Sequence, residues 1–209
     1  MVEALKTSDL PALIAFMNTW MDKKRAALAE LDSLTGDGDM GVTIALIFRS
    51  AVRCIKYIDE DASFAEIFAD LAETIGENAP STFGTLVSTM LQSMADNADG
   101  VDAIDAEEFS RLLHCGADGV SRRGGAKEGD KTLLDAQLPA ARAAAAGMSF
   151  SAAAAAAAAA AQTGADLTVN MKAVTGRAGY MGDRTVGSRD PGAQAIADIL
   201  ASIDAWANE

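Results

Sequence analysis

The sequence predicts an all-α fold of about eight helices in a single domain. Apolar residues recur at helical spacing along most of the chain, and a strand-like pattern is limited to the ambiguous segment at residues 167–174. The chain has 209 residues, half of them hydrophobic, so it can bury one full core. No stretch rich in proline, glycine or serine divides it. We therefore expect residues 1–209 to form one domain.

The first four helices are marked by caps and by the turns between them. The first carries apolar residues at helical spacing over residues 10–21, and Ser8 is its predicted N-cap. The second follows directly on the turn "DGDMG". Ser63 and Glu66 form a capping box that opens the third helix. The fourth is predicted over residues 85–95, "TLVSTMLQSMA".

The fifth and sixth helices flank the polar segment "GGAKEGD". Asp105 and Glu108 match a second capping box, directly ahead of the fifth helix. The sixth covers residues 131–144 and contains Pro139, where we expect a kink because proline has no N–H to donate within a helix.

The last two helices are an alanine run and a proline-led C-terminal helix. Residues 152–161 are all alanine; the run is too short for a membrane span and predicts a closely packed helix. The last helix begins at Asp190, with Pro191 at its first position. The glycines concentrate in four predicted interhelical turns: 36–41, 76–84, 116–129 and 176–192.

Charge and cysteine content exclude several classes of protein. The net charge of −13 argues against a nucleic-acid partner, because phosphate backbones require clustered lysine and arginine. Cys54 and Cys115 match neither a zinc-site spacing nor a disulfide framework. The N-terminal stretch does not have the pattern of a signal peptide, so we expect a cytoplasmic protein without a membrane segment.

An acidic turn is the first candidate site. In "DSLTGDGDMG", Asp32, Asp37 and Asp39 place three like charges within eight positions, beside Gly38 and Gly41. Carboxylate oxygens are the ligands that Mg²⁺ and Ca²⁺ prefer. A solvated acidic turn is the alternative, but a helix starts directly afterwards, and its free N–H groups favour anions. A metal next to a helix start indicates a polyphosphate ligand.

Two glycine-rich loops add basic residues to this pattern. "GGAKEGDKT" (124–132) contains two lysines, which could also be simply solvated, and "GRAGYMGDR" (176–184) places Arg177 and Arg184 on a turn. Arginine suits phosphate recognition through its planar fork. His114, the single histidine, lies among apolar residues of the fifth helix, and we interpret it as structural.

The loops together resemble one family. "LDSLTGDGDMG", "GGAKEGDKTLLDAQLPA" and "GRAGYMGDRTVGSRDPGA" are similar to the nucleotide-binding (L) subunit of dihydroxyacetone kinase, in the family's order and over nearly the whole chain. The resemblance implies a closed barrel of eight antiparallel amphipathic helices with the nucleotide at one end. It also implies that Asp32, Asp37 and Asp39 bind two Mg²⁺ ions between themselves and the phosphates of ADP or ATP.

The resemblance further implies a set of nucleotide contacts. The helix start should contact phosphate, Gly124 and Leu133 should border the adenine pocket, Arg177 should face the phosphates, and residues 190–192 should close the site. No residue is assigned as catalytic. The matching positions are Met40, Gly41, Val42, Thr43, Asn78, Ala79, Gly124, Leu133, Arg177, Asp190, Pro191 and Gly192.

The chain departs from the family pattern at three places. The second loop, "ENAPSTFGT", replaces a GASG-like phosphate turn, and Asn78 and Ala79 are its best matches. The family usually has histidine where this chain has Met40, and commonly another where it has Ser188. These differences put the substrate and nucleotide preference in question. They leave the three aspartates intact.

The implied function is half of a kinase. In the family, a separate K subunit binds the ketone covalently through histidine, and in phosphotransferase-system members a phosphohistidine protein rephosphorylates bound ADP. The stand-alone length favours this second arrangement over ATP as substrate, and a homodimer is left open. The alternatives are a kinase subunit for another keto-sugar, a non-catalytic nucleotide-sensing relative, and the nucleotide domain of a fatty-acid kinase.

Overall fold

The protein is built from helices, as the sequence predicts. The computed structural model describes residues 2–59 and 61–209, and within them no β-strand is formed; Leu5 and Ile104 share a single isolated β-bridge. The ambiguous segment at residues 167–174 folds into a 3₁₀ turn, η2 (Thr168–Asn170), followed by irregular chain. The all-α prediction is confirmed for the described residues.

Eight long helices and four short ones make up the described chain. The short ones are η1 (Thr7–Asp9), η2, α8 (Gly176–Gly179) and η3 (Gly182–Thr185). The long ones are α1 (Leu10–Ser33), α2 (Met40–Cys54), α3 (Phe64–Asn78), α4 (Thr82–Ala95), α5 (Ala106–Gly124), α6 (Leu134–Ala143), α7 (Phe150–Leu167) and α9 (Pro191–Ala207).

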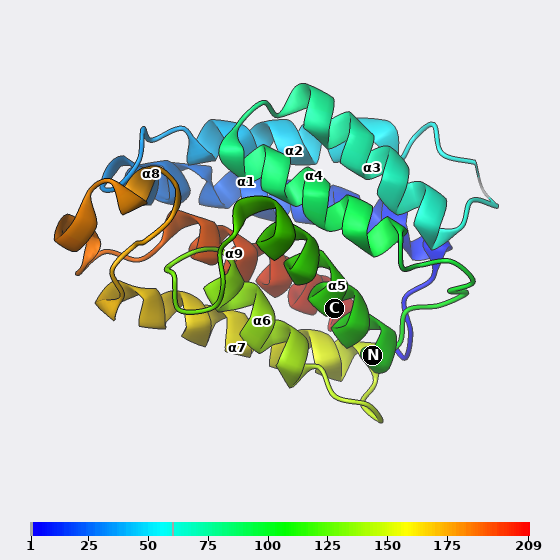
Figure 1. Cartoon of the computed structure of the whole chain (residues 1–209). Coiled ribbons are helices and arrows are strands. Elements are labelled where there is room, and N and C mark those ends of the chain that lie inside the picture. Colours follow the sequence, from blue (N-terminus) through cyan, green and yellow to red (C-terminus); the bar gives the residue numbers. More distant parts are fainter. Residues whose placement is uncertain (1, 60) are drawn as a thin grey trace.

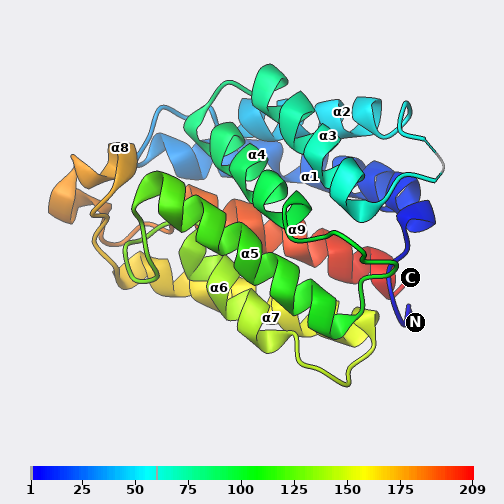
Figure 2. The same ribbon diagram turned by 45° about the vertical axis from the view of Figure 1, so that its right-hand side comes forward.

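The long helices close into a ring. Each packs against the next from α1 to α7, α7 packs against α9, and α9 returns to pack against α1. Figures 1 and 2 show the same arrangement from two sides. The inward faces form one apolar core around a cavity of about 210 Å³, lined by apolar side chains and Gln137. The implied barrel is therefore present in the contacts between helices.

The alanine run belongs to α7, which packs closely against two neighbouring helices. Helix α7 contacts both α6 and α9, and a Cβ added to its Gly164 would lie 1.9 Å from the carbonyl oxygen of Asp135 on α6. Pro139 lies inside α6, four residues after Asp135, so it has no N–H to donate to that carbonyl. Small side chains on α7 let the two backbones approach at this point.

Several predicted helix ends are wrong. Ser8 is not an N-cap: η1 precedes α1, and Asp9 is the residue at the cap position. The fourth helix begins at Thr82, capped by Ser81, so Gly84 is helical. The fifth continues to Gly124, so the predicted turn at 116–129 begins only after that residue. In the last two cases burial of an apolar face continues the helix through glycines that the sequence pattern treats as a break. At Ser8 the reason is local: a 3₁₀ turn, in which the Asp9 carboxylate accepts a hydrogen bond from the N–H of Lys6, precedes α1.

The predicted caps of the third, fifth and last helices are present. The box of Ser63 and Glu66 is formed in both directions. Asp105 caps α5 by accepting a hydrogen bond from the N–H of Glu108, but the carboxylate of Glu108 pairs with Arg111 and does not return to Asp105. Asp190 caps α9, as predicted, with Pro191 as the first helical residue.

The connections that carry the candidate residues gather at one end of the ring. The turn after α1, the α5–α6 connection and the crossover (residues 168–190, between α7 and α9) lie on the left of Figure 1, while the two chain ends lie toward the other end. Every helix in the described part of the chain is too short or too polar to span a membrane. The ring therefore serves as a frame for the loops at one end.

Candidate metal and phosphate site

The acidic turn folds around its own first aspartate. The N–H groups of Thr35 and Gly36 donate to the backbone carbonyl of Asp32, at 3.2 and 2.6 Å. A Cβ on Gly36 would lie 2.2 Å from a carboxylate oxygen of Asp32, so only glycine leaves that carboxylate where it is. Gly38 has φ +75°, a conformation that turns the chain toward α2 and that other residues rarely adopt.

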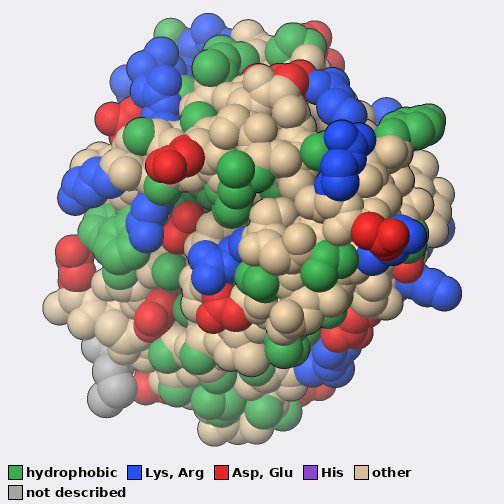
Figure 3. Space-filling view, turned by 90° about the vertical axis from the view of Figure 1, so that its left-hand side faces the viewer, with side chains coloured by type: hydrophobic (Ala, Val, Ile, Leu, Met, Phe, Trp, Pro, Cys, Tyr) green, Lys and Arg blue, Asp and Glu red, His purple; other side chains and the backbone are tan. Residues whose placement is uncertain are grey.

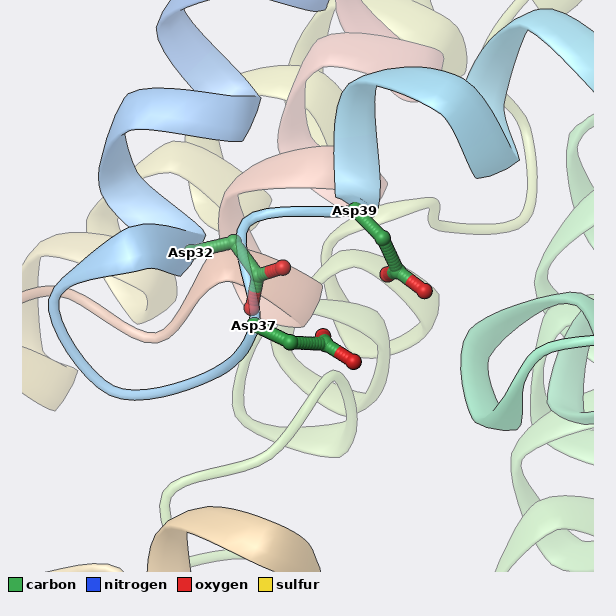
Figure 4. Close-up of side chains that lie close together, drawn as sticks. All are labelled: Asp32, Asp37 and Asp39. Atoms are coloured by element: carbon green, nitrogen blue, oxygen red, sulfur yellow. The ribbon is translucent and has the colours of Figure 1, made fainter.

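Three carboxylates converge on this turn, as the sequence predicts. One oxygen each from Asp32, Asp37 and Asp39 can be chosen so that all lie within 4.8 Å of one another (Figure 4). Asp32 is buried and accepts a hydrogen bond from the N–H of Met40 at 3.2 Å. Asp39 occupies the N-cap position of α2, but its carboxylate makes no capping hydrogen bond. Its carboxylate is therefore not committed to capping the helix.

The surroundings of the turn shift the pKa values of Asp32 and Asp37 in opposite directions. Burial raises the pKa of Asp32, and the neighbouring charges of Asp37 and Asp39 raise it further, against the lowering effect of the Met40 N–H. A hydrogen bond from Arg177 lowers the pKa of Asp37. Arg177 comes from α8 of the crossover, so the positive charge at this turn is supplied from 140 residues away.

The donor set fits a hard divalent cation. All three groups are carboxylates, without a histidine or cysteine that would favour a softer metal. Mg²⁺ is usually held by one or two carboxylates together with waters and substrate phosphates. One buried and two exposed carboxylates beside a helix start provide such a partial coordination shell.

The start of α2 is clamped against α1. A Cβ on Gly41 would lie 2.4 Å from the carbonyl oxygen of Arg25, and the Nε of Arg25 donates to the carbonyl of Gly41 at 3.1 Å. Met40 and Thr43 are buried, whereas Val42 is 57% exposed. Any phosphate at this helix start would therefore meet backbone groups and Val42 rather than the side chains of Met40 and Thr43.

Residues of the second predicted loop form hydrogen bonds and packing contacts within the helical ring. The side chain of Asn78 accepts a hydrogen bond from Arg53 at 2.9 Å and donates to the carbonyl of Thr74 at 2.8 Å. Ala79 is buried, and a Cβ on Gly84 would lie 2.1 Å from its carbonyl oxygen. The two positions have clear packing partners, and their contact with a nucleotide stays a prediction.

The α5–α6 connection contains a buried lysine that the sequence reasoning missed. Lys131 is 3% exposed, and its Nζ lies 2.6–3.2 Å from four backbone carbonyl oxygens of the crossover. Asp135, also buried, accepts hydrogen bonds from the N–H groups of Gly129 and Thr132 and so closes the same turn. A lysine in a glycine-rich loop is normally solvated, and the sequence has no signal that separates Lys131 from Lys127.

The start of α9 meets this turn. The carboxylate of Asp190 accepts a hydrogen bond from the N–H of Ala193 at 2.7 Å, and burial raises its pKa to about 7. A Cβ on Gly192 would lie 3.5 Å from the Cβ of Leu133. The structure therefore places Gly192 beside Leu133, whereas Gly124 is exposed at the end of α5. Contact of these residues with a nucleotide stays a prediction.

The remaining basic residues and the histidine have local partners. Arg189 pairs with Asp166 at 2.5 Å and donates to Gln194. The Nε of Arg184 reaches the carbonyl of Met181 at 3.4 Å. A ring nitrogen of His114 lies 3.0 Å from the carbonyl oxygen of Ser110 within α5.

Comparison with known proteins assigns this arrangement to a family. The family model described as the DAK2 domain matches residues 34–205, which include most of the acidic turn, the Lys131 turn and the crossover. The chain belongs to the DAK2 domain family. This DAK2 chain is 30% identical over 187 residues to the protein named PEP-dependent dihydroxyacetone kinase, ADP-binding subunit DhaL, from Escherichia coli, covering 87% of this chain and 88% of that one.

Longer proteins contain regions similar to this chain. L-erythrulose 1-kinase of Mycolicibacterium smegmatis is 28% identical over 197 residues, which cover 91% of this chain but 34% of the relative. The crystal structure of the dihydroxyacetone kinase from C. freundii in complex with AMP-PNP and Mg²⁺ has the same fold, with a TM-score of 0.77 and 23% identity. The match covers 99% of this chain and 35% of that one, so this chain spans about a third of either protein.

Proposed function

We propose that this DAK2 chain is the ADP-binding subunit of a dihydroxyacetone kinase, which holds the nucleotide while a separate K subunit holds the ketone. The observation that carries the proposal is the convergence of Asp32, Asp37 and Asp39 at the start of α2. Similarity to the E. coli subunit over 87% of the chain supports the same assignment. Residues 1–209 act as one nucleotide-binding unit in this proposal.

The three aspartates would hold two Mg²⁺ ions together with the phosphate oxygens of the nucleotide. Held there, Mg²⁺ would supply positive charge to stabilise the phosphoryl group during its transfer. Asp32 is positioned for this by the N–H of Met40 and by Gly36, which leaves room for its carboxylate. Arg177 would exchange its contact with Asp37 for one with phosphate.

The nucleotide would lie across the loop end of the ring. Its phosphates meet the first turn of α2, its base lies between Gly124 and Leu133, and the start of α9 closes the site. The proximity of Leu133 and Gly192 supports this arrangement, because it brings two of the implied contact segments together. Asn78 and Ala79 are the remaining implied contacts.

The ketone must come from a partner in this mechanism. The sequence contains one histidine, His114, whose ring contacts the Ser110 carbonyl within α5, so it is not placed to trap a carbonyl substrate. The loop end, which faces the viewer in Figure 3, intermixes acidic, basic and apolar side chains. Exposed large apolar residues in the segments at this end are Leu34, Val42, Leu167, Val174, Tyr180 and Val186. Such residues suit a protein partner.

The phosphoryl donor follows from the same assignment. In a phosphotransferase-system kinase, ADP stays bound and a phosphohistidine protein rephosphorylates it. The E. coli relative is named a PEP-dependent kinase, which supports this arrangement over free ATP as substrate. Both partners would then meet the loop end in turn, in the cytoplasm.

A four-carbon keto-sugar is the second candidate substrate. It is favoured by the 28% identity to L-erythrulose 1-kinase over 91% of this chain. Because the ketone is held by the partner, the residues described above serve either substrate equally.

Calorimetry tests the nucleotide site. Wild-type protein should bind ADP tightly with Mg²⁺ and weakly without it, because the carboxylates alone repel the phosphates. Asp37→Asn should abolish the Mg²⁺-dependent binding. Asp99→Asn, the same charge change in the exposed α4–α5 connection at the other end of the ring, should leave it intact. Equal ADP affinity with and without Mg²⁺ contradicts the proposal.

Reconstitution tests the division of labour. The chain alone with Mg·ATP should not phosphorylate dihydroxyacetone, since transfer needs the acceptor held in line with the phosphate and the single histidine is engaged within α5. Addition of a cognate K subunit and the phosphohistidine protein should restore transfer. Turnover by the purified single chain, retained in His114→Ala, would identify a self-sufficient kinase instead.

A further inference from the structure

One side-chain atom, the Nζ of Lys131, contacts the crossover near both of its ends. Its Nζ donates to the backbone carbonyls of four residues in two separate stretches of that segment. The acceptors, with their distances, are Thr168 (2.8 Å), Met171 (3.2 Å), Thr185 (2.6 Å) and Ser188 (2.6 Å). An ammonium has three hydrogens, so these four oxygens use all of its donor capacity.

The two stretches that Lys131 joins are also tied to each other. Thr185 accepts a hydrogen bond from the N–H of Ala173 through its hydroxyl, and the N–H of Gly187 donates to the carbonyl of Val169. The part of the crossover between them, residues 175–184, makes only local backbone hydrogen bonds and carries Arg177. The position of Arg177 therefore depends on two anchored flanks.

The backbone at Lys131 is held in a conformation that lysine seldom adopts. Its φ is +61°, and Lys131 is the one non-glycine residue with positive φ in the described chain. Burial also lowers the pKa of its ammonium, which nearby Asp190 raises in part. A glycine would meet the backbone requirement without strain, so the presence of lysine points to its side chain.

We propose that Lys131 is a positioning residue of the nucleotide site: by holding both flanks of the crossover, it places Arg177 against the acidic turn. The proposal rests on the proposed function, because the consequence for binding assumes that Arg177 meets the phosphates there. Without the ammonium, four carbonyls lose a donor, and the crossover must open to let water reach them. Arg177 then occupies its binding position for only part of the time.

The expected loss of affinity follows from the fraction of time that Arg177 spends in its binding position. If the crossover holds Arg177 in place for about a tenth of the time, the apparent affinity for Mg·ADP falls about tenfold. Lys131→Met keeps the length and the apolar part of the side chain while it removes the donors. Lys127→Met is the matched control, because Lys127 is exposed on the same turn.

Limited proteolysis measures how firmly the crossover is held, and it needs no nucleotide. Arg177 and Arg184 are exposed tryptic sites in the part of the crossover between the anchored flanks. Trypsin should cut Lys131→Met there at least about tenfold faster than wild type or Lys127→Met, because cleavage follows the population of the open form. Far-UV circular dichroism should show unchanged helix content. Equal cleavage rates in all three proteins would overturn the proposal.

A double-mutant cycle separates a positioning role from a general structural one. If Lys131 acts through Arg177, then Lys131→Met should weaken Mg·ADP binding about tenfold in the wild-type background and less than about twofold in Arg177→Ala. If Lys131→Met weakened Mg·ADP binding just as much in the Arg177→Ala background, Lys131 would support the fold and would not act through Arg177. Wild type that fails to bind Mg·ADP would instead refute the proposed function, and the trypsin comparison would still decide the anchoring.

A second variant covers the case in which Lys131→Met does not fold. Lys131→Gly accepts the positive φ without strain and removes the whole side chain, so an added amine can take its place. Butylammonium should restore slow tryptic cleavage and Mg·ADP binding to this variant, whereas the isosteric alcohol should not. Rescue by both compounds alike would assign the effect to filled volume and contradict a role for the ammonium.

Discussion

The acidic turn and the crossover lie at the same end of the ring but are held in different ways. The acidic turn, residues 32–43, is closed by its own residues: backbone N–H groups three to eight positions after Asp32 donate to its carbonyl and its carboxylate. The crossover, residues 168–190, is fastened by Lys131, which lies 37 to 57 positions away from the carbonyls it contacts.

The difference separates two tasks of a binding site. Ligands that must meet a metal at fixed distances benefit from a turn whose geometry is set locally and clamped against α1 through Gly41. A segment that approaches and leaves a nucleotide benefits from a few strong anchors at its flanks, with a freer part between them. We expect the turn to tolerate substitution poorly and the middle of the crossover to tolerate it well.

The largest expected loss of stability comes from a change at Gly41, where the start of α2 packs against α1. Gly41→Ala places a methyl group 2.4 Å from the carbonyl oxygen of Arg25, so the start of α2 must move away from α1. We expect a loss of about 2–3 kcal/mol in the free energy of unfolding, measured by urea denaturation. Gly124→Ala is the control: a Cβ there meets nothing within 4 Å, and stability should hold or rise. Equal stability of the two variants would show that the clamp is not rigid.

An intermediate effect is expected where the crossover enters α9. Burial raises the pKa of Asp190 to about 7, above its value in the unfolded chain, so its contribution to stability is complete below about pH 4 and is lost as the pH rises through 7. An asparagine side chain at this position would keep the N-cap without this titration. Asp190→Asn should therefore match wild type at pH 4 and exceed it at pH 8 by on the order of 2 kcal/mol.

Denaturation curves across this pH range provide the measurement for Asp190. Asp105→Asn is a matched control, because Asp105 caps α5 in the same way at an exposed position. A constant difference between wild type and Asp190→Asn from pH 4 to 8 would contradict the raised pKa.

The smallest effect is expected at an exposed lysine of the crossover. Lys172 pairs with Asp183 at 2.8 Å, and both side chains are more than half exposed. Exposed ion pairs contribute little, so Lys172→Met should shift the melting temperature by less than about 2 °C. Differential scanning calorimetry with Lys131→Met alongside gives the contrast. A large shift for Lys172 would mean that the crossover is stabilised along its whole length and not at its flanks.

Much of the fold and part of the site follow from local sequence signals. The helix periodicity, the cap residues Ser63 and Asp190, and the alanine run each specify structure through contacts within a few positions, and each was predicted. The convergence of Asp32, Asp37 and Asp39 belongs to the same class, because one turn after a helix suffices to bring them together. The helix ends misplaced at residues 82–84 and 116–124 lie where burial against other helices overrides the local pattern. The one at residues 8–10 is displaced by a local 3₁₀ turn.

The rest depended on contacts that no local pattern encodes. Gly41 and Gly164 are fixed by backbones that approach from another helix, and Arg177 reaches Asp37 only because the ring brings the crossover over the turn. Lys131 is the clearest case: the sequence shows a lysine in a polar glycine turn, like Lys127, and the tertiary structure buries one and exposes the other. Burial of a charge is decided by the partners that surround it, and here those partners are carbonyls at least 37 residues away.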